Sequence, residues 1–238
     1  MIYTIATQKG GTGKTTTAAA IAQAAAYKGK RALAIDLDPQ GNLTYCLAAD
    51  ARASGAYDLL HGAPIADVIQ KSPQGIDVIS ASLDLQTEKS SPGSARRLQE
   101  ALAPIKRRYS VIVIDTPATA GELQYNALQA ADRLIIPLEA DAYNIQSVYQ
   151  IADAAAYIPH LKIAGVLLAK YDGRATITKQ LQERLKETAA ALHIPYLGTV
   201  RKAIAVQEAA ALQLSLFDYA PKSKPAADYM RIFETITK

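Results

Sequence analysis

The sequence predicts an α/β fold with a mostly parallel central sheet and helices on both faces of that sheet. Short apolar, β-branched runs alternate with longer amphipathic or Ala-rich stretches along the chain of 238 residues, which is the arrangement of repeated βαβ units. A glycine-rich segment also stands directly between the first apolar run and the first Ala-rich stretch. Because strand-like runs recur across nearly the whole length, we expect a single domain over residues 1–238.

The predicted strands are short runs of apolar and β-branched residues. They cover residues 1–6, 31–36, 76–80, 111–115, 133–138, 162–169 and 196–200. The predicted helices are amphipathic or Ala-rich. They cover residues 14–28, 94–107, 122–131, 144–157, 176–192, 203–213 and 226–237. Residues 50–75 and 82–93 are the least regular parts, and we expect surface connections with short helical pieces there.

Composition excludes several classes of protein. Half of the residues are hydrophobic and 20% are charged, which indicates neither a disordered nor a fibrous chain. The single cysteine, Cys46, excludes an intrachain disulfide, and we expect it to be a buried small apolar residue. We find no leader peptide and no apolar run long enough to span a membrane, so we expect a cytoplasmic protein. The net charge of +4 does not decide whether nucleic acid is a partner.

The glycine-rich segment predicts a phosphate-binding loop, because it follows an apolar strand and opens a helix. Glycines let the backbone N–H groups curl around phosphate oxygens, and the helix N-terminus adds its positive dipole end. Lys14 would place a cation on the β- and γ-phosphates, and the Thr15 hydroxyl would bind Mg²⁺. We therefore expect a P-loop NTPase that uses ATP and Mg²⁺. Its predicted nucleotide-binding residues are Lys9, Gly10, Gly11, Thr12, Gly13, Lys14, Thr15 and Thr16.

The loop departs from the usual P-loop pattern at its first position. Gln8 stands where that pattern has glycine, and Lys9 follows it. Carboxylates then end two later apolar runs: Asp36 and Asp38 follow residues 31–35, and Asp115 follows residues 111–114. Asp115 has the position of a Walker B carboxylate and would bind Mg²⁺ directly or through water. Any one of these aspartates alone is as well explained as a turn or cap residue. Their order along the chain favours a catalytic site.

These motifs resemble the ParA/Soj family of deviant Walker A partitioning ATPases, within the ParA/MinD superfamily. The resemblance is carried by the Lys-Gly-Gly-Thr-Gly-Lys-Thr-Thr run from Lys9 and by the Asp-Leu-Asp-Pro-Gln run from Asp36. Residues 165–174, 200–209 and 219–224 are similar to the same family, so the likeness spans nearly the entire chain.

The resemblance implies roles for individual residues. Asp38 would orient the attacking water, and Asp36 would join Thr15 and Asp115 around Mg²⁺. Lys9 would reach across a homodimer interface to the partner's phosphates, so that ATP drives dimerisation. The catalytic set is therefore Lys9, Lys14 and Asp38. Contact of Lys9 with a phosphate of its own chain stays open, because sequence carries no quaternary geometry.

The resemblance also implies partners. Members of the family bind double-stranded DNA without sequence preference as ATP dimers, so we expect association with the nucleoid and a ParB-type centromere-binding protein that stimulates hydrolysis. The implied DNA contacts are Arg201, Lys202, Lys222 and Lys224. Ordinary surface charge explains each of these residues nearly as well. A second basic cluster is expected to be a solvated face; it comprises Arg96, Arg97, Lys106, Arg107 and Arg108.

Several alternatives remain within and outside this family. A nitrogenase iron protein is disfavoured by the missing thiolates, and a tyrosine kinase of this fold by the scattered tyrosines. A MinD-like membrane regulator, an ATPase that positions another cargo and a biosynthetic ligase of similar fold stay open. The apolar stripe of Tyr229, Ile232, Phe233 and Ile236 is expected to close the core, so we expect no membrane binding. No helix-turn-helix precedes the first strand, which disfavours operator-specific repression.

Overall fold

The computed structural model of the chain describes residues 1–91, 93–140 and 144–238. Pro92, in the predicted irregular stretch 82–93, lies outside the described residues. Within them one eight-stranded sheet has the order β3-β4-β2-β5-β1-β6-β7-β8. The strands are β1 (Ile2–Ile5), β2 (Ala32–Asp36), β3 (Gln70–Lys71), β4 (Asp77–Ile79), β5 (Val111–Asp115), β6 (Arg133–Glu139), β7 (Lys162–Tyr171) and β8 (Tyr196–Arg201).

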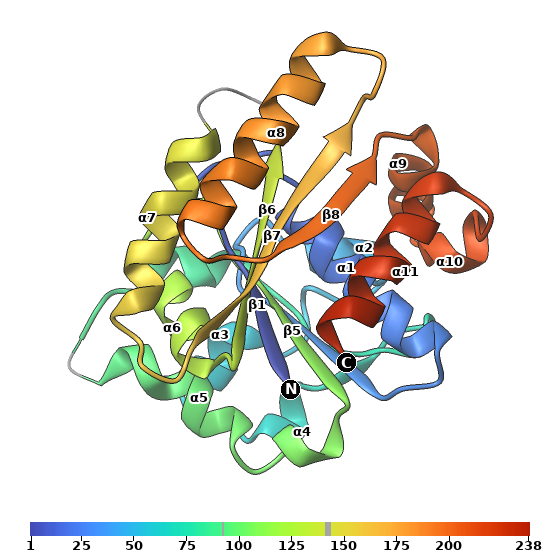
Figure 1. Cartoon of the computed structure of the whole chain (residues 1–238). Helices are drawn as coiled ribbons and strands as arrows, with labels where there is room; N and C mark the ends of the chain where they lie inside the picture. The colour runs from blue at the N-terminus through green and yellow to red at the C-terminus, as the bar shows by residue number, and fades with distance from the viewer. Residues whose placement is uncertain (92, 141–143) are drawn as a thin grey trace.

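Helices surround this sheet, as Figure 1 shows. The α-helices are α1 (Lys14–Tyr27), α2 (Asn42–Cys46), α3 (Ala56–Leu60), α4 (Ile65–Val68), α5 (Arg97–Leu102), α6 (Glu122–Ala130), α7 (Asn144–Ala156), α8 (Thr176–Ala191), α9 (Ile204–Ala211), α10 (Leu216–Tyr219) and α11 (Lys224–Ile236). Short 3₁₀ segments are η1 (Leu83–Thr87), η2 (Ser94–Arg96) and η3 (Lys106–Arg108).

The first strand of the chain lies inside the sheet and not at its edge. β1 pairs in parallel with β5 on one side and with β6 on the other. All described strand pairs are parallel except that of β3 with β4 at one edge. Parallel strands joined by crossover helices place all their carboxyl ends at one edge of the sheet. The predicted fold class is confirmed.

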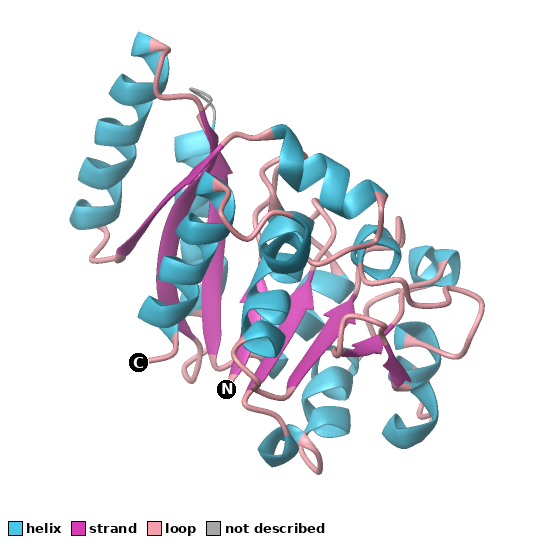
Figure 2. Ribbon diagram, turned by 90° about the vertical axis from the view of Figure 1, so that its right-hand side faces the viewer, coloured by secondary structure: helices cyan, strands magenta, loops and turns pink. Residues whose placement is uncertain are grey.

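The two faces of the sheet are both covered, which explains why the inner strands are apolar throughout. Along β5, Val111 and Val113 lie in the hydrophobic cluster that contains α1 and α11. Ile112 and Ile114 lie in the cluster on the opposite face, which contains residues of α5, α6, α7 and α8. Figure 2 shows the strands between these two layers of helices. Helix α1 is buried on most of its surface, so its composition is Ala-rich and not amphipathic.

Some predicted elements differ from the structure. The predicted helix 94–107 is confirmed only in its middle, as α5: η2 precedes it and η3 follows it, and the α-helix stops before Pro104, which lacks the N–H that a continuing helix needs. The irregular stretch 50–75 contains α3 and α4, as expected, but also the edge strand β3. Cys46 is only partly buried at the end of α2, and this burial raises the pKa of its thiol to about 11.

The last helix closes one face of the core, as its sequence pattern predicts. Tyr229, Ile232 and Phe233 are each no more than 2% exposed. The Ser223 hydroxyl caps α11 by accepting the Ala226 N–H at 3.4 Å. The helix reaches the first strand, because the Tyr3 hydroxyl donates to the Ile236 carbonyl at 2.7 Å. No helix among the described residues is both long enough and apolar enough to cross a membrane.

Candidate active site

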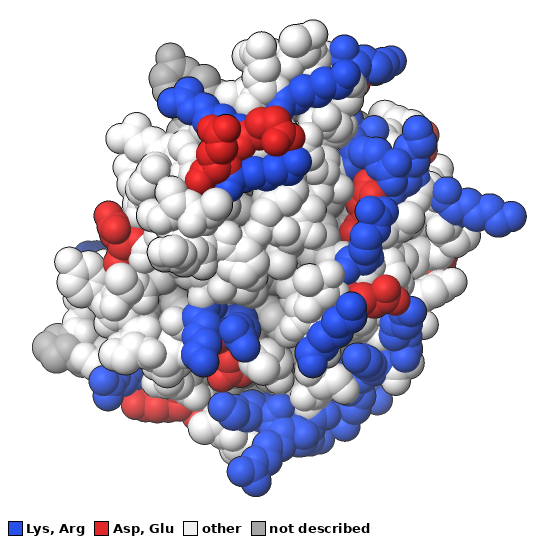
Figure 3. All heavy atoms as spheres, viewed as in Figure 1, with Lys and Arg blue, Asp and Glu red and all other residues white. Residues whose placement is uncertain are grey.

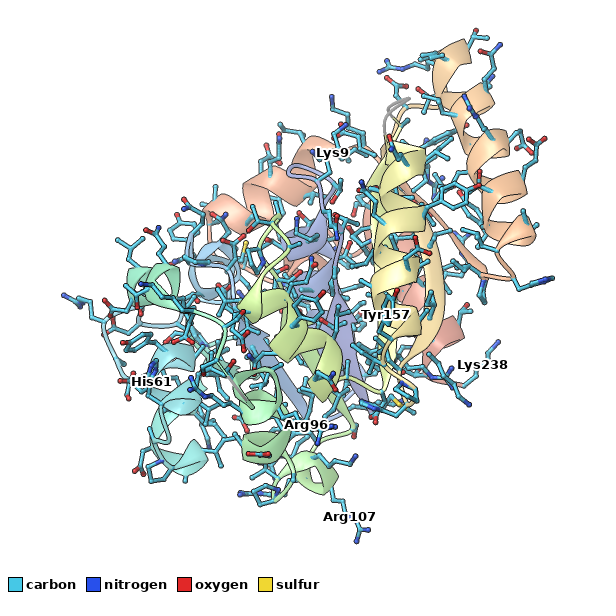
Figure 4. The ribbon with its side chains drawn as sticks, turned by 90° about the vertical axis from the view of Figure 1, so that its left-hand side faces the viewer. Lys9, His61, Arg96, Arg107, Tyr157 and Lys238 are labelled. Atoms are coloured by element: carbon cyan, nitrogen blue, oxygen red, sulfur yellow. The ribbon has the colours of Figure 1, made fainter. Side chains whose placement is uncertain are left out.

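The candidate site lies at the carboxyl edge of β1, β2 and β5, where the sequence motifs meet. Strand register places Ile5 beside Asp115, and Asp115 beside Asp36, on adjacent parallel strands. The phosphate loop leaves β1 at this same edge. Figure 4 shows Lys9 at the end of the molecule that lies opposite Arg107. Predictions drawn from three separate parts of the chain therefore converge in space.

The phosphate loop needs glycine at two positions. Gly11 and Gly13 have φ of 77° and 92°, in the left-handed region that side chains with a Cβ rarely adopt. A Cβ on Gly13 would also lie 3.2 Å from the Cβ of Ala169 at the end of β7. Helix α1 begins immediately after Gly13, so the unpaired N–H groups of its first turn face the loop. This backbone is suited to bind phosphate oxygens.

Lys14 is buried inside the loop, at the start of helix α1. Its side-chain ammonium donates to the Lys9 carbonyl at 3.1 Å, and the residue is only 6% exposed. Burial lowers the pKa of Lys14, whereas the charges of Asp115 and Asp38 act in the opposite direction. The Thr12 hydroxyl lies 2.9 Å from that of Thr7, which fixes the other side of the loop. A cation is thus held where phosphates would lie.

Asp115 fits a Mg²⁺ ligand because one of its oxygens lacks a partner. The side chain is fully buried; Oδ1 accepts the Thr116 N–H at 3.1 Å, whereas Oδ2 has no hydrogen-bond partner among the described residues. Burial, followed by the neighbouring Asp36, raises the pKa of Asp115 well above its usual value, and the Thr15 hydroxyl and Lys14 oppose this rise. A cation at Oδ2 would stabilise the ionised carboxylate.

Asp36 is more fully occupied by the protein itself. Oδ2 accepts both the N–H and the hydroxyl of Thr44 at 2.8 Å, and Oδ1 accepts the Asp38 N–H at 3.0 Å. Burial raises the pKa of Asp36 to about 6, although these hydrogen bonds lower it. Its predicted magnesium role remains a prediction; the geometry shows that Asp36 positions the turn carrying Asp38.

Asp38 is half-buried and lies in that turn, where its Oδ1 accepts the Gln40 N–H at 3.0 Å. Lys9 is also half-buried, and Gly10 and Gly11 beside it are exposed. Among the described residues, no three His, Cys, Asp or Glu side chains form a metal cluster. Mg²⁺ usually takes one or two protein ligands together with phosphate oxygens and water, so Thr15 and Asp115 would be enough to hold it here.

A cavity of about 300 Å³ adjoins the phosphate loop, and sequence reasoning missed it as a site. Gly13 and Thr16 line one side, and the ends of β7 and β8 with the start of α9 line the other. Tyr171 and Arg201 are register partners, so these two strand ends lie side by side. In the sequence, residues 165–174 and 200–203 are similar to the ParA/Soj family. That similarity alone does not predict that they line a pocket. The cavity is large enough for a nucleotide base.

The predicted DNA contacts are less uniform. Arg201 donates from Nε and Nη2 to Asp228, at 2.8 Å and 2.7 Å, and Asp228 is buried. The three lysines are all exposed: Lys202, Lys222 and Lys224. Lys224 is the first residue of α11. Figure 3 shows Lys and Arg side chains gathered over the side of the molecule where α9 and α11 lie in Figure 1.

The second basic cluster contains two ion pairs among its described contacts. Arg97 pairs with Glu88 at 3.7 Å, and Lys106 pairs with Asp132 at 3.8 Å. Both cations are at least 38% exposed. This agrees with the solvated face that the sequence predicts.

Comparison with known proteins places these features in a family context. A family model described as an AAA domain matches residues 1–162. The chain is 31% identical to the chromosome-partitioning ATPase Soj of Thermus thermophilus, over 98% of this chain and 93% of that protein. It is 36% identical to the chromosome partitioning protein ParA of Caulobacter vibrioides, over 78% of this chain and 75% of that protein.

Solved structures share the fold. A cobyrinic acid a,c-diamide synthase of Mycobacterium smegmatis, with a bound ATP analogue and magnesium, is 28% identical with a TM-score of 0.83, over 98% of this chain and 92% of that one. The cell division ATPase MinD of Pyrococcus furiosus is 22% identical with a TM-score of 0.83, over 99% and 97%. The second likeness concerns the fold alone.

Proposed function

Because this chain belongs to the ParA/Soj family of ATPases, we propose that it is a partitioning ATPase whose binding to double-stranded DNA is timed by ATP. The observation that carries the proposal is the meeting of the Lys9-bearing phosphate loop with Asp38 and the partly unpaired Asp115. A metabolic kinase or ligase has no evident use for Lys9 at this position. The cargo would be a plasmid or a chromosome, and the protein would act in the cytoplasm at the nucleoid.

Each residue of the site has a physical task in hydrolysis. The loop N–H groups and Lys14 bind the phosphates of ATP and neutralise charge that develops as the γ-phosphoryl group leaves. Thr15 and Asp115 would hold Mg²⁺, which supplies further positive charge on the phosphate oxygens. Asp38 orients the attacking water from a turn that Asp36 positions through its hydrogen bond to the Asp38 N–H. The base would occupy the cavity beside Gly13 and Thr16.

Lys9 supports a nucleotide-dependent homodimer. It stands at the start of the loop beside the exposed Gly10 and Gly11, so a second copy facing this end would meet it. We expect Lys9→Ala to retain nucleotide binding but to lose ATP-dependent dimerisation, because the cation on the partner's phosphates would be missing. Analytical ultracentrifugation with ATP, ADP and no nucleotide measures this. Wild-type-like dimers of Lys9→Ala with ATP would contradict the role across the interface.

DNA binding is the central test of the partition role. Phosphate contacts need only positive charge and reach, and they make affinity depend steeply on salt. We expect salt-sensitive DNA binding by the wild type with ATP and by Asp38→Ala, which traps ATP, and much weaker binding with ADP or without nucleotide. Measurement by fluorescence anisotropy at two salt concentrations checks it. Equal or absent binding in all nucleotide states would defeat the partition role while leaving the ATPase assignment untouched.

A ParB-type protein is the proposed stimulating partner. Relatives named as chromosome partitioning proteins support a system of this kind. Addition of such a protein with DNA should raise the ATP turnover, because a bound partner can complete the positioning of Asp38 and water. If a centromere-binding protein encoded beside this chain leaves the ATP turnover unchanged, the result would argue for another cargo.

A MinD-like membrane regulator is the second candidate, supported by the shared fold. The apolar face of α11 argues against it, because Tyr229, Ile232 and Phe233 are packed in the core and are not available to lipid. ATP-dependent sedimentation with anionic liposomes, in the absence of DNA binding, would select this candidate. ATP turnover that requires cobyrinic acid would instead select a biosynthetic enzyme similar to the cobyrinic acid a,c-diamide synthase that shares this fold.

A further inference from the structure

Lys170, at the end of β7, contacts the phosphate loop directly. Its ammonium donates to the Gly11 carbonyl at 2.7 Å and to Glu139 Oε2 at 3.3 Å. Glu139 ends the neighbouring strand β6, where it is the register partner of Ala169. One cation therefore joins two adjacent strand ends to the glycine loop.

The backbone conformation at Lys170 is unusual for a residue other than glycine, and it orients the side chain toward the phosphate loop. Lys170 has φ of 53°, in the left-handed region, although it is not a glycine. The register between β7 and β8 also shifts between Leu168 and Tyr171, as in a β-bulge. A bulge with one left-handed residue re-aims a side chain relative to a regular strand, and such strain persists where the surroundings require it.

Gly11 has little else to fix it. It is exposed, and apart from its two chain neighbours no described residue has an atom within 4 Å of where its Cβ would be. A trans peptide is planar, so its carbonyl and its N–H point in opposite directions. The hydrogen bond from Lys170 to the Gly11 carbonyl therefore also sets the direction of the Thr12 N–H, one of the backbone donors of the loop.

We propose that Lys170 is a positioning residue that orders the phosphate loop for nucleotide, by fixing the Gly11–Thr12 peptide through its ammonium group and its contact with Glu139. It acts through the loop and needs no contact with the phosphates. The strained backbone at residue 170 persists because it directs the ammonium to this carbonyl. The inference rests on the proposed nucleotide site and is independent of DNA binding and of dimerisation.

The test compares nucleotide affinity with stability in variants of the full chain. Lys170→Met keeps the length of the side chain but removes the charge, and we expect about tenfold weaker MgADP binding, as for loss of one charge-assisted hydrogen bond. Lys170→Arg should recover most of the affinity. Lys170→Gly removes the ammonium and relieves the backbone, so it should bind as weakly as Lys170→Met while its melting temperature equals or exceeds that of the wild type.

Titration calorimetry with MgADP, thermal melts and steady-state ATP hydrolysis provide the measurements, and Lys179→Met on the exposed side of α8 is the matched control. We expect KM for ATP to rise for Lys170→Met while kcat stays within about twofold, because bound phosphates themselves order the loop. The inference would be overturned if Lys170→Met binds MgADP within about twofold of the wild type. It would also be overturned if the variants lose affinity only in proportion to their loss of melting temperature and Lys170→Arg recovers none of it. A wild type that fails to bind MgADP would instead overturn the proposed nucleotide site.

Discussion

Two regions of the molecule carry charged residues that the proposed function uses, and they are organised differently. The first is the carboxyl edge of β1, β2 and β5; the second is the segment from β8 to α11. At the first, buried groups are placed by strand register, as Asp36 and Asp115 are. At the second, Lys202, Lys222 and Lys224 lie on turns or at a helix start and reach solvent. Phosphoryl transfer needs fixed geometry, whereas contact with a polyanion needs charge and reach. The difference predicts unequal sensitivity to single substitutions.

The largest effect is expected at Lys14. Its buried ammonium donates to the Lys9 carbonyl and interacts with the charges of Asp115 and Asp38. Lys14→Ala should lower kcat/KM for ATP by about a thousandfold. Steady-state hydrolysis measures this, with circular dichroism to verify folding. If kcat/KM falls by less than about tenfold, the carboxyl edge tolerates substitution as well as exposed surface positions do, and the expected difference between the two regions is absent.

Asp38 should follow Lys14 in size of effect. Its carboxylate is half-buried in a turn, so Asp38→Ala should leave the fold and nucleotide affinity nearly intact while kcat falls by about a hundredfold. Single-turnover hydrolysis separates the chemical step from binding. Asp84→Ala, an acidic residue on η1, is the control. An equal loss of ATP affinity and kcat would assign Asp38 to binding instead.

Asp228 tests whether the second region also contains a geometrically fixed point. This buried carboxylate accepts from the Arg201 side chain and N–H and from Arg231 at 3.2 Å. Asp228→Ala should lower the free energy of unfolding by about 2 kcal/mol, because it removes a buried carboxylate that accepts charge-assisted hydrogen bonds from two partly exposed arginines. Chemical denaturation measures it. Glu234→Ala, which breaks the exposed pair with Lys28, should show no measurable change.

The smallest effects are expected at the surface lysines. Lys222→Ala and Lys224→Ala together should weaken DNA binding severalfold and reduce the slope of log affinity against log salt by about one for each DNA phosphate that the variant no longer neutralises. Arg201→Ala should add little, since Asp228 already neutralises much of its charge. Anisotropy over a salt series measures the slope. An unchanged slope in the double variant would place the DNA contacts elsewhere.

Much of the first region could be predicted because its signals are local. An apolar run, a glycine turn and a helix are consecutive, and parallel strands necessarily bring their carboxyl ends together. The residues that the structure adds come from long-range contacts. The cavity between the ends of β7 and β8 depends on strand pairing, and the ion pair of Arg201 with Asp228 joins residues 27 positions apart.

Two other differences have local causes that the patterns obscured. Pro104 interrupts the predicted helix 94–107, although the surrounding residues have helical periodicity. Pro225 favours a later start for the last helix, at residue 226, but proline is well tolerated in a first turn, so α11 begins at Lys224. The left-handed backbone at Lys170 could not be expected, because a lysine carries no signal for that conformation.

The central place of β1 has a consequence for how the protein is made. Strand β1 leaves the ribosome before its two neighbours in the sheet, because β5 and β6 begin only at residues 111 and 133. Nascent β1 therefore waits unpaired until β5 and then β6 have been synthesised, and the hydrogen bond from Tyr3 to Ile236 joins residues 233 positions apart. Translation speed through the middle of the gene thus bears on how long an apolar strand is exposed to chaperones and to aggregation.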